Sequence, residues 1–196
     1  MTVAERYWWT MYLNASVFRV PHVIERLRRE ARQVVVNELS KPSAEFDALK
    51  GDAPEVTLLE WAINNHPGRL ANSGMKILVN LLGNERAIDR IIHFRWFIRD
   101  LSSSSRRLLL GDDPFLRVND LYRPGTLISI PLSPTRAFFG TDASDIANNI
   151  MNLGAREVVN RLNVETLRKA KRFVYGDAER SFIEKHLPLF TKTVVS

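Results

Sequence analysis

Two adjacent carboxylates, Asp112 and Asp113, have the best position for chemistry in this sequence. They lie between Gly111 and Pro114, a turn signature in which an Asp side chain commonly accepts hydrogen bonds from nearby backbone amides. Adjacent carboxylates at the end of a strand also hold divalent cations or act as a base. One hypothesis is therefore a catalytic Mg²⁺ site at Asp112, with Asp113 as a second candidate, and the competing interpretation is a capped turn.

A second group of candidate residues is cationic and falls within one predicted helix. The predicted binding residues are Arg161, Arg168, Lys169 and Arg172. Guanidinium groups form paired hydrogen bonds with phosphates and carboxylates, which indicates nucleic acid or an acidic protein as the partner. Lys171 adds to the charge, whereas Glu157 and Glu165 dilute it, and an ordinary solvated helix face has the same composition.

Other catalytic patterns are missing from the sequence. The chain has no cysteine, which excludes disulfides, thiolate nucleophiles and cysteine-ligated zinc or iron–sulfur sites. Its four histidines are far apart in the sequence, with no His-x-His or His-x-x-x-His pair. Ser133 lies between two prolines but lacks the Gly-x-Ser-x-Gly elbow of a hydrolase. Glycine-rich dinucleotide and Walker-type phosphate loops are also absent.

The composition is that of a basic globular protein. In 196 residues, 45% are hydrophobic and 26% are charged, and 28 Lys and Arg against 22 Asp and Glu give a net charge of +6. No apolar run approaches the roughly 20 residues that cross a bilayer, and the N-terminus has no secretory pattern. We therefore expect a soluble cytoplasmic protein that makes no membrane contact.

The helices that must position these side chains follow from periodicity and capping. Apolar residues at helical spacing predict a helix over residues 3–18, and Pro21 is well placed as the first residue of a second helix. Short helices are predicted over residues 55–63, 73–82 and 85–92. A longer helix is predicted over residues 154–175, ended by Gly176, and a last one extends to about His186.

Strands are predicted in the middle of the chain. Residues 93–99 are aromatic and β-branched, and the four serines at 102–105 predict a hairpin loop that leads to a second strand over residues 106–110. Residues 126–131 and 136–139 supply two more short strands, separated by an elbow of prolines. The expected product is a small antiparallel sheet.

We therefore predict an α+β fold, in which a helical N-terminal layer packs on a small antiparallel sheet and a C-terminal helix closes the structure. A single domain is expected over residues 1–196, with a mainly helical half in 1–92, the sheet in 93–140 and C-terminal helices in 141–196. The leading functional hypothesis is a basic binding or regulatory domain that contacts nucleic acid or an acidic partner.

Two alternatives remain open, so the residues do not decide whether the chain is an enzyme. One is a metal-dependent phosphodiesterase or nuclease that uses Asp112 and Mg²⁺. The other is a scaffold or homo-oligomerisation domain, because Tyr7, Trp8 and Trp9 point to more than one side of the first predicted helix.

A resemblance supports the predicted fold. From Trp96 to Gly176 the chain resembles the C-terminal portion of the bacterial domain of unknown function 4238 family. Members of that family carry a tryptophan strand, a Thr-Ser-Asp-Asn-Pro-like turn, a Pro-Leu-Ser-Pro elbow and a closing helix. The matching positions are Trp96, the turn Leu110-Gly111-Asp112-Asp113-Pro114, the elbow Pro131-Leu132-Ser133-Pro134, and Asn163 with Ala170 and Val174-Tyr175.

The sequence departs from the family pattern in two places. Gly111 and Asp113 stand where members usually have Ser and Asn, so that Asp112 and Pro114 are the matching residues of the turn. Family members usually begin with a His-Tyr-Val-Pro-like segment, which this sequence lacks. We therefore expect a short member or a fragment, and the resemblance implies a fold but no reaction.

Overall fold

The computed structural model describes residues 1–52, 54–55, 57–68, 72, 80, 83–177 and 180–191. The chain divides into two compact units, one made of Met1–Val17 with Glu85–Ser196 and the other of Phe18–Asn84. The helix predicted over residues 73–82 lies outside the described residues except for Asn80. That the whole chain is one domain remains a prediction.

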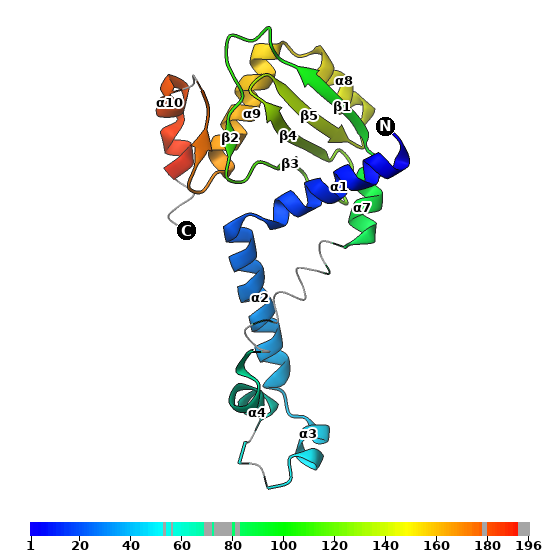
Figure 1. Ribbon diagram of the computed structural model, residues 1–196, viewed down its shortest axis with the longest axis vertical. Coiled ribbons are helices and arrows are strands. Elements are labelled where there is room, and N and C mark those ends of the chain that lie inside the picture. The colour runs from blue at the N-terminus through cyan, green and yellow to red at the C-terminus, as the bar shows by residue number, and fades with distance from the viewer. Residues whose placement is uncertain are drawn as a thin grey trace. The chain divides into compact units, whose positions relative to one another are not determined.

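The first unit is built on a four-stranded antiparallel sheet (Figure 1). The strand order is β1-β5-β4-β3, with bounds β1 Arg95–Asp100, β5 Arg136–Thr141, β4 Leu127–Ser133 and β3 Leu116–Val118. A two-residue turn joins β4 to β5, and a register shift between Pro131 and Ser133 bends the end of β4. With its helices, this sheet confirms the predicted α+β class.

Helix α1 (Val3–Phe18) and helix α7 (Glu85–Ile92) supply the core on one face of the sheet. Leu13 of α1 and Ile91 of α7 pack with Phe138 of β5, and all three are at most 4% exposed. The Trp9 ring meets Phe138 edge-on with their centroids 5.6 Å apart. The aromatic residues of the predicted strand therefore form the contact between helix and sheet.

Helices α8 (Ser144–Asn152) and α9 (Ala155–Lys169) supply the core on the opposite face. Val159 and Leu162 of α9 pack with Phe139 of β5, whose side chain points away from α1 because neighbouring strand residues alternate between faces. Arg99 of β1 donates hydrogen bonds to the carbonyl oxygens of Ile150 and Leu153 at the end of α8. The sheet therefore lies between two layers of helices.

The hairpin predicted around the four serines is wrong. β1 pairs along its whole length with β5, and the segment after the serines does not return along β1. The Leu101 N–H donates to the Thr135 oxygen at 2.7 Å, and the Leu108 N–H donates to the Pro134 oxygen at 2.9 Å. Residues on both sides of the serines therefore bind the β4–β5 turn instead of each other, because both leucines are buried there.

The long helix predicted to end at Gly176 is also wrong. α9 ends at Lys169, and residues 174–175 form a short strand, β6 (Val174–Tyr175). β6 pairs antiparallel with β2 (Leu110–Gly111), and α10 (Arg180–Thr191) follows it. Leu109, Leu167 and Phe182 make a small core beneath this ribbon. The last helix was predicted to end at about His186, whereas α10 extends to Thr191.

The second unit is helical in its described part. Its helices are α2 (Pro21–Leu39), α3 (Ala44–Leu49) and α4 (Leu58–Asn65), and α2 begins at Pro21 as predicted. Thr57 and Glu60 form a capping box at the start of α4, in which each side chain accepts a hydrogen bond from the other residue's backbone N–H. Among the described residues, no helix has the length and apolar character needed to cross a membrane.

The buried hydroxyl of Thr10 provides a test of the packing between α1 and the sheet. Thr10 is 0% exposed, and among the described residues its Oγ1 has no hydrogen-bond partner. A buried hydroxyl without a partner costs roughly 1–3 kcal/mol. We expect Thr10→Val, which keeps the shape of the side chain, to raise the free energy of unfolding by about 1–2 kcal/mol in urea titrations.

Thr126→Val is the matched control for this prediction. Thr126 is also 0% exposed, but its hydroxyl lies 2.6 Å from the Asp120 carbonyl oxygen and 2.7 Å from that of Arg123. The same substitution should therefore lower the stability by about 1–2 kcal/mol at this position. A stability change of the same sign at both positions contradicts the prediction.

Candidate functional site

Asp112 joins the end of β2 to the segment that follows α9. Its two carboxylate oxygens accept hydrogen bonds from the backbone N–H groups of Lys171 at 2.9 Å and Arg172 at 2.8 Å. Its own N–H donates to the Phe173 carbonyl oxygen at 3.0 Å. Asp112 thus caps the chain where α9 ends and β6 begins, which is the physical reason that the helix does not continue to Gly176.

Asp113 points the other way and is buried. Its side chain is 6% exposed and lies 2.9 Å from Nζ of Lys169, which also donates to the Phe115 carbonyl oxygen. Lys169 therefore holds the turn after β2 against the last turn of α9. The two adjacent carboxylates therefore bind different partners.

Three further positions of the family resemblance meet at the same place. Asn163 of α9 is 0% exposed; its Oδ1 accepts from the Leu109 N–H at 2.8 Å, and its Nδ2 donates to the Arg107 oxygen at 2.9 Å. A Cβ atom on Gly111 would lie 3.3 Å from Cβ of Ala170, so the backbone of β2 passes close to the helix end. We call this contact between β2 and α9 the β2–α9 junction.

In the part of the chain that the structure describes, the predicted Mg²⁺ site at Asp112 has no supporting cluster of ligands. Within the described ranges, no group of three or more His, Cys, Asp or Glu side chains is placed so that it could hold a metal ion. Asp120 and Asp142 are engaged elsewhere: Asp120 accepts from the Tyr122 N–H, and Asp142 pairs with Arg90 at 2.7 Å. The geometry gives Asp112 a capping contact, as in the competing interpretation.

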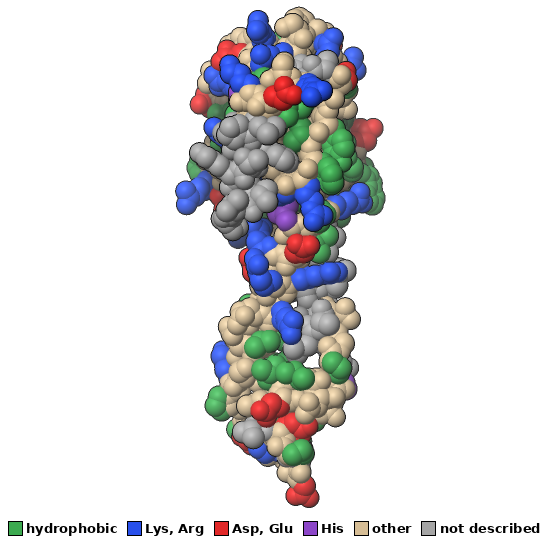
Figure 2. All heavy atoms as spheres, turned by 90° about the vertical axis from the view of Figure 1, so that its left-hand side faces the viewer, with side chains coloured by type: hydrophobic (Ala, Val, Ile, Leu, Met, Phe, Trp, Pro, Cys, Tyr) green, Lys and Arg blue, Asp and Glu red, His purple; other side chains and the backbone are tan. Residues whose placement is uncertain are grey.

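Two of the four predicted cations form ion pairs with acidic side chains of the same helix. Arg161 pairs with Glu157 at 2.6 Å, and Arg168 pairs with Glu165 at 2.5 Å. Arg172 lies beyond the end of α9 and is exposed. On the described part of the face shown in Figure 2, Lys and Arg side chains lie among acidic and uncharged ones.

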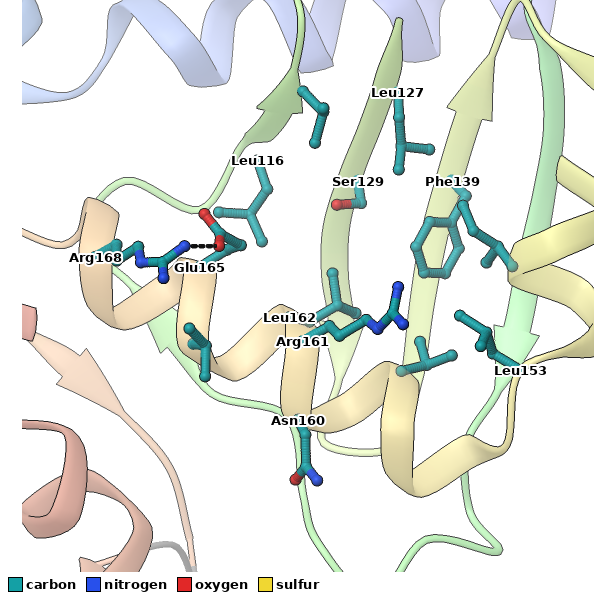
Figure 3. Close-up of a pocket in the computed structure, with 14 residues that line it drawn as sticks. Leu116, Leu127, Ser129, Phe139, Leu153, Asn160, Arg161, Leu162, Glu165 and Arg168 are labelled. Atoms are coloured by element: carbon teal, nitrogen blue, oxygen red, sulfur yellow. Dashed lines mark hydrogen bonds and ion pairs between the residues drawn. The ribbon is translucent and has the colours of Figure 1, made fainter. Parts of the chain in front are cut away.

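A hollow on the α8–α9 face of the sheet is a stronger candidate for binding. This pocket has a volume of about 550 Å³, within the range of roughly 300–1,000 Å³ that is usual for ligand sites. Its floor is made by strands β3, β4 and β5, and α8 and α9 flank it. The residues labelled in Figure 3 are Leu116, Leu127, Ser129, Phe139, Leu153, Asn160, Arg161, Leu162, Glu165 and Arg168.

Polar groups are few in this pocket and occupy defined places. Ser129 is 4% exposed and contributes the hydroxyl of an otherwise apolar floor. The Arg161 side chain extends across the hollow toward Phe139 and Leu153, whereas the Arg168–Glu165 ion pair lies at the β3 end (Figure 3). A ligand with an apolar body and an anionic group fits this distribution.

A smaller pocket of about 220 Å³ shares Leu116, Val118, Glu165 and Arg168 with the first and adds Arg117 and Lys169. We refer to the two pockets together as the α9 groove. Four cations and one carboxylate line the α9 groove: Arg117, Arg161, Arg168, Lys169 and Glu165. Of the four predicted binding residues, Arg172 is the one that lines neither pocket.

Arg117 and Ser129 were not among the binding residues predicted from the sequence. Ser129 stands in a predicted strand, whereas β3, which carries Arg117, was not predicted and is only three residues long. A strand this short gives no usable alternation of apolar and polar residues. They meet α9 only because β3 and β4 pair with Leu116 opposite Ser129. No local signal could have found this site.

The aromatic residues near the N-terminus divide between core and surface. Trp9 stacks on Tyr12 and contacts Phe138, whereas Trp8 is 69% exposed and meets Tyr7 edge-on. Exposed aromatic side chains favour contact with another surface. Oligomerisation through α1 remains a prediction.

These contacts define an α+β protein in which a small antiparallel sheet between helices carries an open groove on one face. The chain belongs to the DUF4238 family, described as a protein of unknown function, whose family model matches residues 18–180. The match begins at residue 18 and so extends the resemblance, which starts at Trp96, to helical residues of the N-terminal half. No match was found among curated proteins or among solved structures.

Proposed function

We propose that this chain is a binding domain that captures an acidic partner, with apolar side chains, in the α9 groove. One observation carries the proposal: an apolar floor lies beneath side chains that include four cations and one carboxylate. Apolar surface supplies affinity when it is removed from water, and cations at a rim select anionic partners and accelerate their association.

An acidic polypeptide fits the α9 groove better than nucleic acid does. Proteins that hold single strands combine cations with several aromatic side chains on which bases stack. Among the described residues, Phe139 is the one aromatic residue that lines the pockets. A polypeptide in which apolar side chains alternate with carboxylates offers apolar groups to the floor of the groove and negative charge to its cations.

The test uses the acetylated peptide Ser-Asp-Leu-Asp-Val-Asp-Ser with a fluorescein label, and fluorescence anisotropy reports its binding to the whole chain. We expect the combined variant Arg117→Glu and Arg161→Glu to weaken binding at least tenfold, because the reversed charges turn the electrostatic attraction of the acidic peptide into repulsion. Both residues line the α9 groove, and both are exposed, so the substitutions should leave the core intact.

The matched control changes two exposed cations that do not line the groove. Arg172→Glu combined with Arg29→Glu alters the net charge by the same amount, and we expect binding within about twofold of the unchanged chain. No binding of the peptide, or an equal loss in both variants, overturns the proposal. Tighter binding of a 20-nucleotide RNA or DNA, with steep salt dependence, indicates a nucleic-acid partner instead.

A further inference from the structure

The smaller of the two pockets runs along the edge of β3. Leu116, Arg117 and Val118, the three residues of β3, all line it. Successive side chains of a strand point to opposite faces, so a pocket on one face would touch only alternate residues. A pocket that touches all three lies beside the backbone of the strand. β4 occupies the other side of β3, so the pocket lies at the outer edge of the sheet.

The opposite wall of this pocket is the last part of α9, with Glu165, Arg168 and Lys169. Within the described residues, β3 pairs with β4 alone, so one edge of its backbone has no neighbouring strand. A channel between an edge strand and a helix is an arrangement in which peptides add a strand to a sheet. Main-chain hydrogen bonds then supply affinity, and pockets for alternate side chains supply selectivity.

We propose that the acidic partner binds as an extended segment that pairs with β3 and becomes a fifth strand of the sheet. This inference rests on the proposed function and specifies the kind of partner. Every second side chain of the added strand would enter the apolar hollow beside Leu116 and Val118, which line both pockets. The intervening side chains would lie on the face of Arg117 and would be acidic.

The charge on this edge explains how pairing with the wrong strand is avoided. Proteins protect edge strands by keeping them short and by placing charged side chains on them, and β3 has three residues with an exposed Arg117 at its centre. Two copies of this edge repel one another through Arg117, whereas an acidic strand is attracted to it. The same residue therefore opposes self-association and favours the proposed partner.

The experiment is a backbone N-methyl scan of the acidic peptide Ser-Asp-Leu-Asp-Val-Asp-Ser. Methylation removes one N–H donor at a time and leaves the side chains unchanged. We expect two or more alternate positions to weaken binding about tenfold and the positions between them to stay within about twofold, because a strand directs every second amide toward its neighbour. An unmethylated peptide with Lys in place of Asp is the control for charge and should not bind.

Hydrogen exchange followed by NMR supplies a second readout on the chain itself. At least one backbone amide of β3 should exchange at least fivefold more slowly when the peptide is bound. Peptide binding without alternation in the scan, and without slower exchange in β3, overturns the added strand and leaves the proposed function standing. Absence of any peptide binding overturns both proposals together.

Discussion

Replacing Asn163 with alanine should lower the free energy of unfolding by about 3–5 kcal/mol, a large part of the 5–15 kcal/mol that is typical of a whole domain. The side chain is 0% exposed and satisfies the Leu109 N–H and the Arg107 carbonyl oxygen together. Alanine leaves the buried Leu109 N–H without this partner, at roughly 1–3 kcal/mol, removes a hydrogen bond to the Arg107 carbonyl oxygen and creates a small cavity. Urea unfolding followed by circular dichroism measures the loss.

Asn160→Ala is the matched control for Asn163→Ala. Asn160 lies about one turn earlier on α9 and accepts a hydrogen bond from the Arg106 side chain at 2.9 Å. Because Arg106 can bind water in its place, we expect a loss of at most about 1 kcal/mol. Equal losses for the two variants would show that Asn163 does not hold the β2–α9 junction.

Asp112→Ala should lower the melting temperature by about 5–10 °C in buffer that contains EDTA. The carboxylate accepts hydrogen bonds from two backbone N–H groups, and bonds to a charged acceptor contribute roughly 1.5–3 kcal/mol each, less where water reaches them. We expect a total loss of about 2–3 kcal/mol and a smaller one for Asp112→Asn, which keeps one acceptor oxygen. Thermal unfolding monitored by circular dichroism gives both values.

The same melting experiment with magnesium or manganese separates the capping contact from metal chemistry. A ligand that binds the folded state must raise the melting temperature. If Asp112 acts as a cap, the loss in Asp112→Ala is the same with and without the metal. A metal-dependent rise that Asp112→Ala abolishes would favour the phosphodiesterase hypothesis and refute a purely capping contact.

Local patterns in the sequence were sufficient for features that depend on neighbouring residues. Apolar residues at helical spacing predicted the bounds of α1 correctly, because apolar residues three or four apart fall on one face of a helix. Pro21 marked the start of α2, since proline lacks the N–H that the first turn leaves unsatisfied. The turn interpretation of Asp112 follows from the preference of Asp for backbone amides, although its partners lie 59 and 60 residues away.

Strand pairing and the end of α9 were decided by contacts between distant parts of the chain. The serines at 102–105 have the composition of a hairpin, yet Leu101 and Leu108 bind the β4–β5 turn. Residues after Lys169 continue an apolar pattern that is compatible with a helix. The backbone N–H groups of two of them donate hydrogen bonds to the Asp112 carboxylate instead. Composition specifies that a segment turns or extends; it does not specify which strand it meets.

The sequence by itself determined an α+β protein with a basic composition; it predicted a set of cations near one helix and left Asp112 as either a capped turn or a metal site. Only the tertiary structure decided that Arg117 joins Arg161, Arg168 and Lys169 beside an apolar floor, while Arg172 lies outside the pockets. The physical reason is that a groove consists of surfaces from several elements. Side-chain periodicity acts within one element, whereas the pairing of β3 with β4 and the packing of α9 place these residues together.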